Sequence, residues 1–213
     1  MSFCELPYSE DLQVLRTPLK VKNRTIPNRI VYQPMEGCDS VPATGEPSDL
    51  TIRRYDRFAE GGAGLIWFEA VAVQVPGRAN PRQLFLTEEN SDHFKRILER
   101  IKEKCIKVNG YEPVVIMQLT HSGRYSKPNG VPEPLIAYNK PIFEGDKPIS
   151  SDRILSDEQI DHVREDFIRC ATLAEKLGFD GADIKSCHGY LNSELFSAFL
   201  RPGKYGGSFE NRT

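Results

Sequence analysis

The regular alternation of apolar, strand-like runs with amphipathic helical stretches restricts the fold of this sequence more than any other feature. Residues 64–68 and 113–119 are two such runs, and they are typical of strands that are covered on both faces of a sheet. Between them, residues 91–104 repeat apolar side chains at helical spacing. Strands that alternate with helices in this way pack as a parallel sheet with the helices outside.

Two further strands and two further helices extend this pattern. Residues 28–33 form a strand that must end at Pro34, because proline cannot donate to a central ladder. Residues 179–185 form the last strand, and we expect all of the strands to be apolar. The remaining elements are a hairpin over residues 17–26 and helices over residues 48–60 and 156–177.

The pattern leaves two architectures open, a (β/α) barrel and an open doubly wound sheet. Polar side chains follow the strands at Glu69, at Gln118 and over residues 185–190, which favours the mouth of a barrel. No Gly-x-Gly-x-x-Gly follows a strand, which weighs against a dinucleotide-binding sheet. We therefore predict the α/β class and favour a (β/α) barrel over the open sheet. Residues 1–213 cover about strands 1–4, with a long, proline-rich surface loop over residues 120–156.

Composition narrows the classes of partner and the compartment. The formal charge is −2, which gives no electrostatic reason to expect binding to nucleic acid or to an anionic membrane. No apolar run approaches the ~18 residues of a membrane span, and the N-terminus lacks the pattern of a signal peptide. The five cysteines contain no Cys-x-x-Cys pair, so we expect free thiols in a reducing, cytoplasmic compartment. We assign no metal ligands.

A cluster of titratable side chains lies directly after the fourth strand. Lys185, His188 and Tyr190 fall within six residues, straight after the apolar positions Ala182 and Ile184. A strand that ends in such groups presents them at its C-terminal edge, and ligands of α/β proteins bind at that edge. The cluster is therefore the candidate site.

Five motifs stand in order along the chain, each on the strand or loop expected for it. They are Asn28-Arg29-Ile30 with Pro34-Met35, Gly62-Ala63-Gly64-Leu65-Ile66 with Glu69-Ala70, Gln118-Leu119-Thr120-His121-Ser122-Gly123-Arg124, His188-Gly189-Tyr190-Leu191, and Arg201-Pro202 with residues 205–212. With these motifs the sequence resembles the Old Yellow Enzyme family of NADH:flavin oxidoreductases, or ene-reductases, along nearly its whole length.

The resemblance implies an FMN-binding barrel of the (β/α)8 TIM-barrel type, in which FMN takes hydride from NADH or NADPH and passes it to an activated alkene. The flavin ring would lie across the C-terminal mouth of the barrel, beside Pro34, Met35 and Glu36. Ala70 would contact the ring from the second strand. Gln118 would hydrogen-bond its pyrimidine edge, because an amide offers both donors and an acceptor.

The resemblance also assigns roles to the cluster after the fourth strand. Lys185 and His188 would bind the carbonyl oxygen of a small unsaturated substrate, where donors stabilise the charge that grows in the transition state. Tyr190 would protonate the α-carbon. The implied reaction is reduction of the C=C bond of an enone, an enoate or an enoyl thioester.

Two positions depart from the family pattern. Lys185 stands where histidine is usual, and a lysine is a longer, charged donor. Substrates with a carboxylate or a thioester near the alkene are therefore favoured over simple enones. Glu36 stands where threonine or cysteine is usual near the flavin. A carboxylate there disfavours reduced, anionic flavin unless it points away or is protonated.

Each residue of the cluster also has a structural interpretation. Lys185 can pair with a carboxylate such as Glu69 or Glu36, or it can be a Schiff-base lysine of the kind found in barrel aldolases. His188 can be a loop histidine and Tyr190 a core tyrosine. The residues that we interpret as structural, orienting the long loop, are His121 and Arg124.

The length of the chain limits what it can do alone. A complete (β/α)8 barrel takes ~250 residues, whereas this chain offers four strands and reaches, over residues 208–212, what resembles the first turn of a fourth helix. We therefore expect the N-terminal half of a larger enzyme, with little FMN affinity and no ene-reductase activity of its own. The expected protein partner is a second copy or the missing C-terminal half. The alternative function is a non-catalytic half-barrel that acts through protein contacts.

Overall fold

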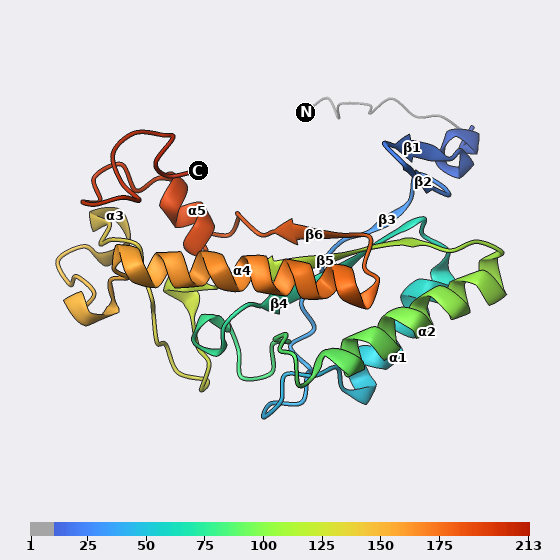
Figure 1. Ribbon diagram of the computed structural model, residues 1–213, viewed down its shortest axis with the longest axis horizontal. Helices are drawn as coiled ribbons and strands as arrows, with labels where there is room; N and C mark the ends of the chain where they lie inside the picture. Colours follow the sequence, from blue (N-terminus) through green and yellow to red (C-terminus); the bar gives the residue numbers. More distant parts are fainter. Residues whose placement is uncertain (1–10) are drawn as a thin grey trace, which may run out of the picture.

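The computed structural model describes residues 11–213, which form a four-stranded parallel sheet, a small hairpin and surrounding helices (Figure 1). The strands are β1 Leu19–Val21, β2 Arg24–Ile26, β3 Val31–Tyr32, β4 Leu65–Ala72, β5 Val114–Thr120 and β6 Gly181–Ile184. The α-helices are α1 Asp49–Gly61, α2 Ser91–Asn109, α3 Pro141–Glu144, α4 Asp157–Leu177 and α5 Leu191–Phe196. Short 3-10 helices span Gln13–Arg16, Val75–Gly77, Gly123–Tyr125 and Ser151–Arg153.

The strand order distinguishes between the two architectures that the sequence left open. The main sheet runs β3-β4-β5-β6, so each strand pairs with the next one along the chain and every pair is parallel. A doubly wound sheet reverses its strand order at a switch point, and no reversal occurs among the described strands. The order is that of consecutive (β/α) units in a barrel.

The two helices with the clearest start signals begin where the sequence predicts. Ser156 caps α4, since its hydroxyl accepts from the backbone N–H of Gln159 at 3.1 Å while the Gln159 side chain accepts from the Ser156 N–H at 2.8 Å. Ser48 caps α1 in the same reciprocal way. Gly62 and Gly178 end these helices in the left-handed conformation, which glycine adopts without a Cβ penalty.

The core lies between the sheet and the three long helices. Phe68 of β4 is fully buried and stacks on Tyr55 of α1, with ring centroids 4.2 Å apart. Phe94 of α2 and Phe179, just before β6, flank the same ring. One aromatic side chain of β4 therefore joins two helices and the start of the last strand.

Three local expectations differ from the structure. The last strand is neither apolar throughout nor covered on both faces, since β6 contains the half-buried Asp183 and leaves Ala182 and Ile184 exposed. Residues 208–212 form turns and bends rather than a helical turn. Helix α5 was not expected, since its six residues are too few to show a clear helical period.

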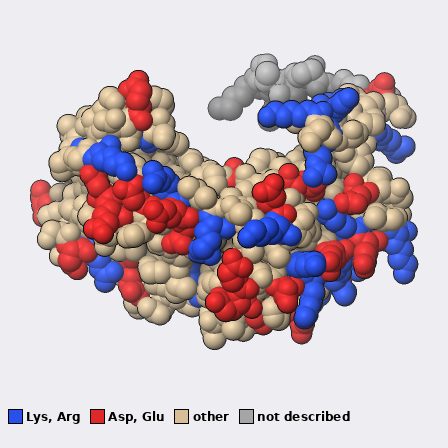
Figure 2. Space-filling model, viewed as in Figure 1, with Lys and Arg blue, Asp and Glu red and all other residues tan. Residues whose placement is uncertain are grey.

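Charged side chains are intermixed on the face shown in Figure 2, where lysines and arginines alternate with acidic groups. Ion pairs between α1 and α2, such as Arg100 with Asp56 at 2.6 Å, belong to this pattern. In residues 11–213, no helix is both long and apolar enough to cross a membrane.

We predict that Phe68→Ala lowers the free energy of unfolding by about 3–5 kcal/mol, because it leaves a cavity in the core and removes the stacking partner of Tyr55. Denaturant unfolding followed by circular dichroism measures the loss. Leu50→Ala is the matched control, since Leu50 is 52% exposed on α1. Equal losses in the two variants would contradict this packing.

Candidate active site

Parallel pairing places the carboxyl ends of the four strands at one edge, and several of the predicted site residues lie there. The segment after β3 contributes Glu36, and the segment after β6 contributes Lys185. Their side chains form a direct ion pair between Glu36 Oε1 and Lys185 Nζ. The first and last strands of the described sheet are thereby joined through side chains, across 149 residues of sequence.

The Lys185–Glu36 pair is well shielded from solvent. The Lys185 side chain is 2% exposed and that of Glu36 is 18% exposed. The Lys185 backbone N–H donates to the carbonyl of Leu119 at 2.9 Å, which continues the β5–β6 pairing past the end of β6. Of the carboxylate partners considered for Lys185, the structure selects Glu36, whereas Glu69 pairs with Arg54.

Tyr190 lies under the lysine. The Lys185 ammonium nitrogen is 4.6 Å from the centroid of the Tyr190 ring, which is within range of a cation–π interaction. Burial, with Glu36 as the second cause, raises the pKa of Tyr190 to about 12. The phenol is therefore protonated at neutral pH.

His188 approaches Tyr190 through a sharp turn. His188 and Gly189 both have positive φ values, 59° and 66°, and this conformation is uncommon for a residue other than glycine. The turn brings the rings of His188 and Tyr190 to 6.0 Å, nearly perpendicular to each other. His188 is exposed, so its ring is open to a ligand at this edge.

The residues expected beside a cofactor are only partly brought together. Gln118 is 7% exposed, and its amide nitrogen donates to Asp183 Oδ2 at 2.7 Å. Pro34 is half-buried and Met35 is 68% exposed, so a ligand could contact both side chains. Ala70 is fully buried, and its side chain has no free surface in this conformation.

A buried charge cluster beneath this edge was missed at the level of sequence. Arg54 of α1 pairs with both Asp39 and Glu69, and Glu69 also accepts from the Gly37 N–H at 2.8 Å. Burial raises the pKa of Glu69. A Cβ on Gly37 would overlap the Arg54 guanidinium, so a larger residue there would displace the Arg54 side chain. The available signal was a glutamate inside an otherwise apolar strand, which requires a partner.

Gln83 was also missed, because it lies in a loop without a recognisable motif. It is 1% exposed, and its amide nitrogen lies 3.3 Å from Glu36 Oε2 and 3.3 Å from the carbonyl oxygen of Ala70. Its amide oxygen accepts from the Ala79 N–H at 2.7 Å. Gln83 therefore supports the carboxylate that Lys185 binds.

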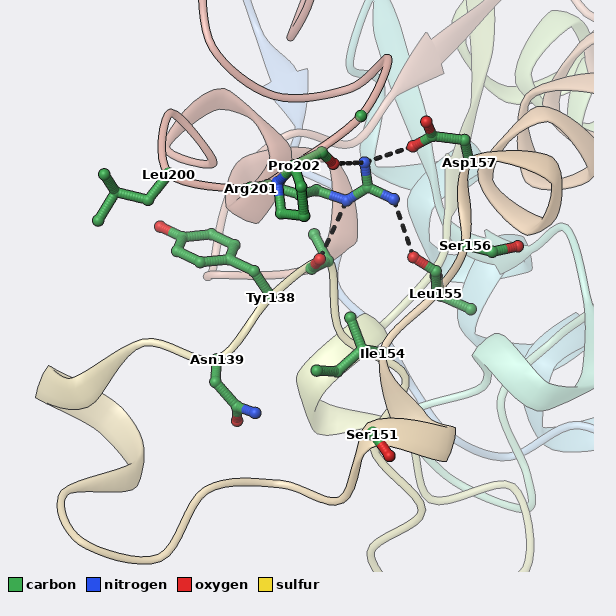
Figure 3. A pocket seen from close by; sticks show the side chains of 12 residues that line it. Tyr138, Asn139, Ser151, Ile154, Leu155, Ser156, Asp157, Leu200, Arg201 and Pro202 are labelled. Atoms are coloured by element: carbon green, nitrogen blue, oxygen red, sulfur yellow. Dashed lines mark hydrogen bonds and ion pairs between the residues drawn. The ribbon is translucent and has the colours of Figure 1, made fainter.

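Two arginines with largely buried side chains hold the long loop. Arg124 pairs with Glu144 of α3 and with Glu194 of α5, as its structural interpretation predicted. A cavity of about 690 Å³ lies near the start of α4, and Figure 3 shows Arg201 beside it. The Arg201 guanidinium donates to Asp157 and to carbonyls of Ala137 and Leu155, so its hydrogen bonds are already made within the protein.

Comparison with known proteins identifies the family. The sequence profile of the NADH:flavin oxidoreductase / NADH oxidase family matches residues 14–213. The chain belongs to this family. The NADPH dehydrogenase of Bacillus subtilis is 32% identical over 201 residues, which are 93% of this chain and 56% of that enzyme. The NADPH dehydrogenase of Halalkalibacterium halodurans is 34% identical over 194 residues, 90% of this chain and 54% of that enzyme.

A solved structure agrees with the fold. The Old Yellow Enzyme homologue of Zymomonas mobilis superposes with a TM-score of 0.74 at 26% identity, over 93% of this chain and 56% of that one. The solved Old Yellow Enzyme structures that match this chain are TIM barrels, so the predicted fold class and family are confirmed. The chain spans about half the length of the curated relatives it matches. The family uses FMN, with NADH or NADPH as hydride donor, as the resemblance implied.

The residues at the carboxyl edge fit a flavin in chemical type. Gln118 offers an amide at a strand end, and Met35 offers exposed apolar surface. A flavin ring requires both kinds of group, polar partners at its pyrimidine edge and apolar contacts on its faces. Gln118, Pro34 and Met35 stay the residues of this chain that are predicted to contact FMN.

His121 generates a prediction about stability. Burial lowers its pKa from 6.5 to about 4, and its Nδ1 accepts from the Gly123 N–H at 3.1 Å. Between pH 6.5 and about 4, His121 is therefore protonated in the unfolded chain but neutral in the folded chain. Stability from this group is complete above pH 6.5 and is lost as the pH falls toward 4, by up to about 3 kcal/mol.

The measurement is the free energy of unfolding of the wild type and of His121→Asn at several pH values. The asparagine oxygen can replace Nδ1 as the acceptor but does not titrate. The stability difference between wild type and variant should shrink as the pH is lowered from 6.5 to 4. A constant difference would show that His121 is not buried in its neutral form.

Proposed function

We propose that this chain forms the N-terminal part of an FMN-dependent oxidoreductase that takes hydride from NADH or NADPH and reduces the C=C bond of a small unsaturated carbonyl compound. The observation that carries the proposal is the meeting of Lys185, His188 and Tyr190 at the carboxyl edge of the parallel sheet. The proposal includes a reducing, cytoplasmic location, which is supported by four free cysteines among the described residues.

The proposed roles follow from the charges and the distances. The cofactor, when bound at this edge, would supply the hydride. Lys185 has three N–H donors, so it can bind Glu36 and still donate to a carbonyl oxygen that becomes negative during the reaction. His188 adds a second donor from an exposed position. Tyr190, protonated at neutral pH, gives its proton to the α-carbon.

The ion pair also narrows the proposed substrate. Glu36 already balances the charge of Lys185, and a substrate carboxylate would bring a second negative charge beside it. A neutral carbonyl gains negative charge only in the transition state, so the site stabilises that state more than the bound substrate. We therefore favour neutral unsaturated carbonyls, thioesters among them, over enoate anions.

The alternative, a half-barrel that acts through protein contacts, is supported by an apolar groove beside β6. The groove has a volume of about 750 Å³. Its apolar lining includes Val163, Phe167, Ile184, Leu195, Phe196 and Phe209. In the described part of the chain β6 pairs only with β5, so one edge of β6 is free to accept another strand. Under this alternative a second copy of the chain is the proposed occupant, whereas under the enzyme proposal the C-terminal half occupies the same groove.

We predict that joining this chain to the part of the Bacillus subtilis NADPH dehydrogenase beyond the matched region gives a yellow protein that oxidises NADPH. Tyr190→Phe in this chimera should slow alkene reduction by about 10²-fold or more, because the proton donor is lost. Reduction of the bound flavin by NADPH should stay at the rate of the parent chimera. Stopped-flow absorbance separates the two half-reactions.

Tyr125→Phe is the matched control, since Tyr125 packs beside Tyr190 at 6.0 Å but has no assigned chemistry. Equal rates of alkene reduction in the parent and in Tyr190→Phe would refute the role of Tyr190. A folded, colourless chimera would instead favour the non-catalytic alternative.

A further inference from the structure

Glu36 is held from two sides, and each of its oxygens has its own donor. Oε1 binds Lys185 Nζ, and Oε2 lies 3.3 Å from the amide nitrogen of Gln83. A carboxylate held by a single lysine can rotate about that contact. The second donor fixes the plane of the group and with it the direction from which Lys185 is bound.

The orientation of the Gln83 amide is determined by its surroundings. Its oxygen accepts from the Ala79 N–H, so its NH2 group must face the two acceptors Glu36 and Ala70. The Gln83 backbone is fixed as well, because the Arg78 guanidinium donates to its carbonyl at 2.6 and 3.0 Å. These contacts fix both the side chain and the backbone of Gln83.

We propose that Gln83 is a positioning residue that, through Glu36, holds the ammonium group of Lys185 over the ring of Tyr190. The chain of contacts runs from the loop after β4, through the segment after β3, to the segment after β6. It therefore links the carboxyl ends of three strands at the candidate site. The inference rests on the proposed function only for the chemical roles of Lys185 and Tyr190.

Several groups near Tyr190 can change its environment and must be told apart in any test of Gln83. Glu36, Cys38 and Cys187 act on its hydroxyl electrostatically, the His188 ring lies 6.0 Å away, and Lys185 covers its face. Among these groups, Gln83 donates a hydrogen bond only to Glu36. The direct contact between Gln83 and these groups is therefore its hydrogen bond to Glu36.

A double-mutant cycle on the 213-residue chain tests the proposal without flavin or alkene. The variants are Gln83→Met, Glu36→Gln and the two combined. The first readout is the acetylation rate of Lys185 by an amine-reactive reagent, followed by mass spectrometry of its peptide. We expect Glu36→Gln to raise this rate about tenfold, because the loss of a buried charged hydrogen bond frees the amine. Gln83→Met should raise it about threefold.

The combined variant decides whether Gln83 acts through Glu36. Its acetylation rate should equal that of Glu36→Gln alone. The second readout is the ionisation midpoint of Tyr190, taken as the tyrosinate absorbance difference from the matching Tyr190→Phe chain. In the wild type we expect this midpoint near pH 12. In Glu36→Gln it should be lower, because a negative neighbour of Tyr190 is removed.

Three outcomes would overturn the proposal. The first is a Gln83→Met effect that persists undiminished in the Glu36→Gln background. The second is an unchanged Lys185 rate in both single variants. The third is a parallel rise at Lys102, which pairs with the remote Glu112 at 2.8 Å and would report a general loss of fold. Gln83→Leu is the second variant, since it also removes the donor to Glu36 and adds no charge beside it. In the double-mutant cycle it should change the acetylation rate of Lys185 as Gln83→Met does. This outcome does not depend on whether the proposed enzyme activity is found.

Discussion

The candidate site depends on the in-order parallel pairing of β3, β4, β5 and β6. Parallel strands that follow the chain without reversal end at the same edge. Segments that lie more than a hundred residues apart in sequence, such as those holding Glu36 and Lys185, therefore meet there. A single antiparallel strand in this sheet would send its polar end to the opposite side. Residues from different strands can therefore act on one ligand only because the strands pair in this order.

The second condition is that buried charges at this edge find partners. Glu69 would be costly inside the sheet without Arg54, and Lys185 would be costly without Glu36. The two pairs are linked through the segment after β3, since Gly37 donates to Glu69 and Glu36 binds Lys185. This short segment therefore connects the core charge cluster with the residues proposed for catalysis. Its conformation follows from both pairs rather than from local propensity.

Local signals predicted the helix starts, whereas tertiary contacts determined most of the site. The N-caps Ser48 and Ser156 act within their own first turns, so sequence alone could place them. The exposure of Ile184 depends on which strands flank β6, and no local pattern records that. The sequence could reveal the cluster of Lys185, His188 and Tyr190, because these residues lie close together directly after one strand. The choice of Glu36 over Glu69 for Lys185, and the support from Gln83, required the three-dimensional arrangement.

The central claim is that the carboxyl edge of this sheet holds a flavin, and FMN binding to the chimeric full barrel tests it most directly. Titration followed by flavin fluorescence should give one FMN per chain. Gln118→Leu should weaken binding about tenfold, as expected for the loss of a buried hydrogen bond worth about 1.5 kcal/mol. Gln13→Leu, on an exposed helix far along the chain from β5, should bind as the parent does. Equal affinity in all three proteins would contradict the assignment of Gln118, and no FMN binding by the folded barrel would contradict the account itself.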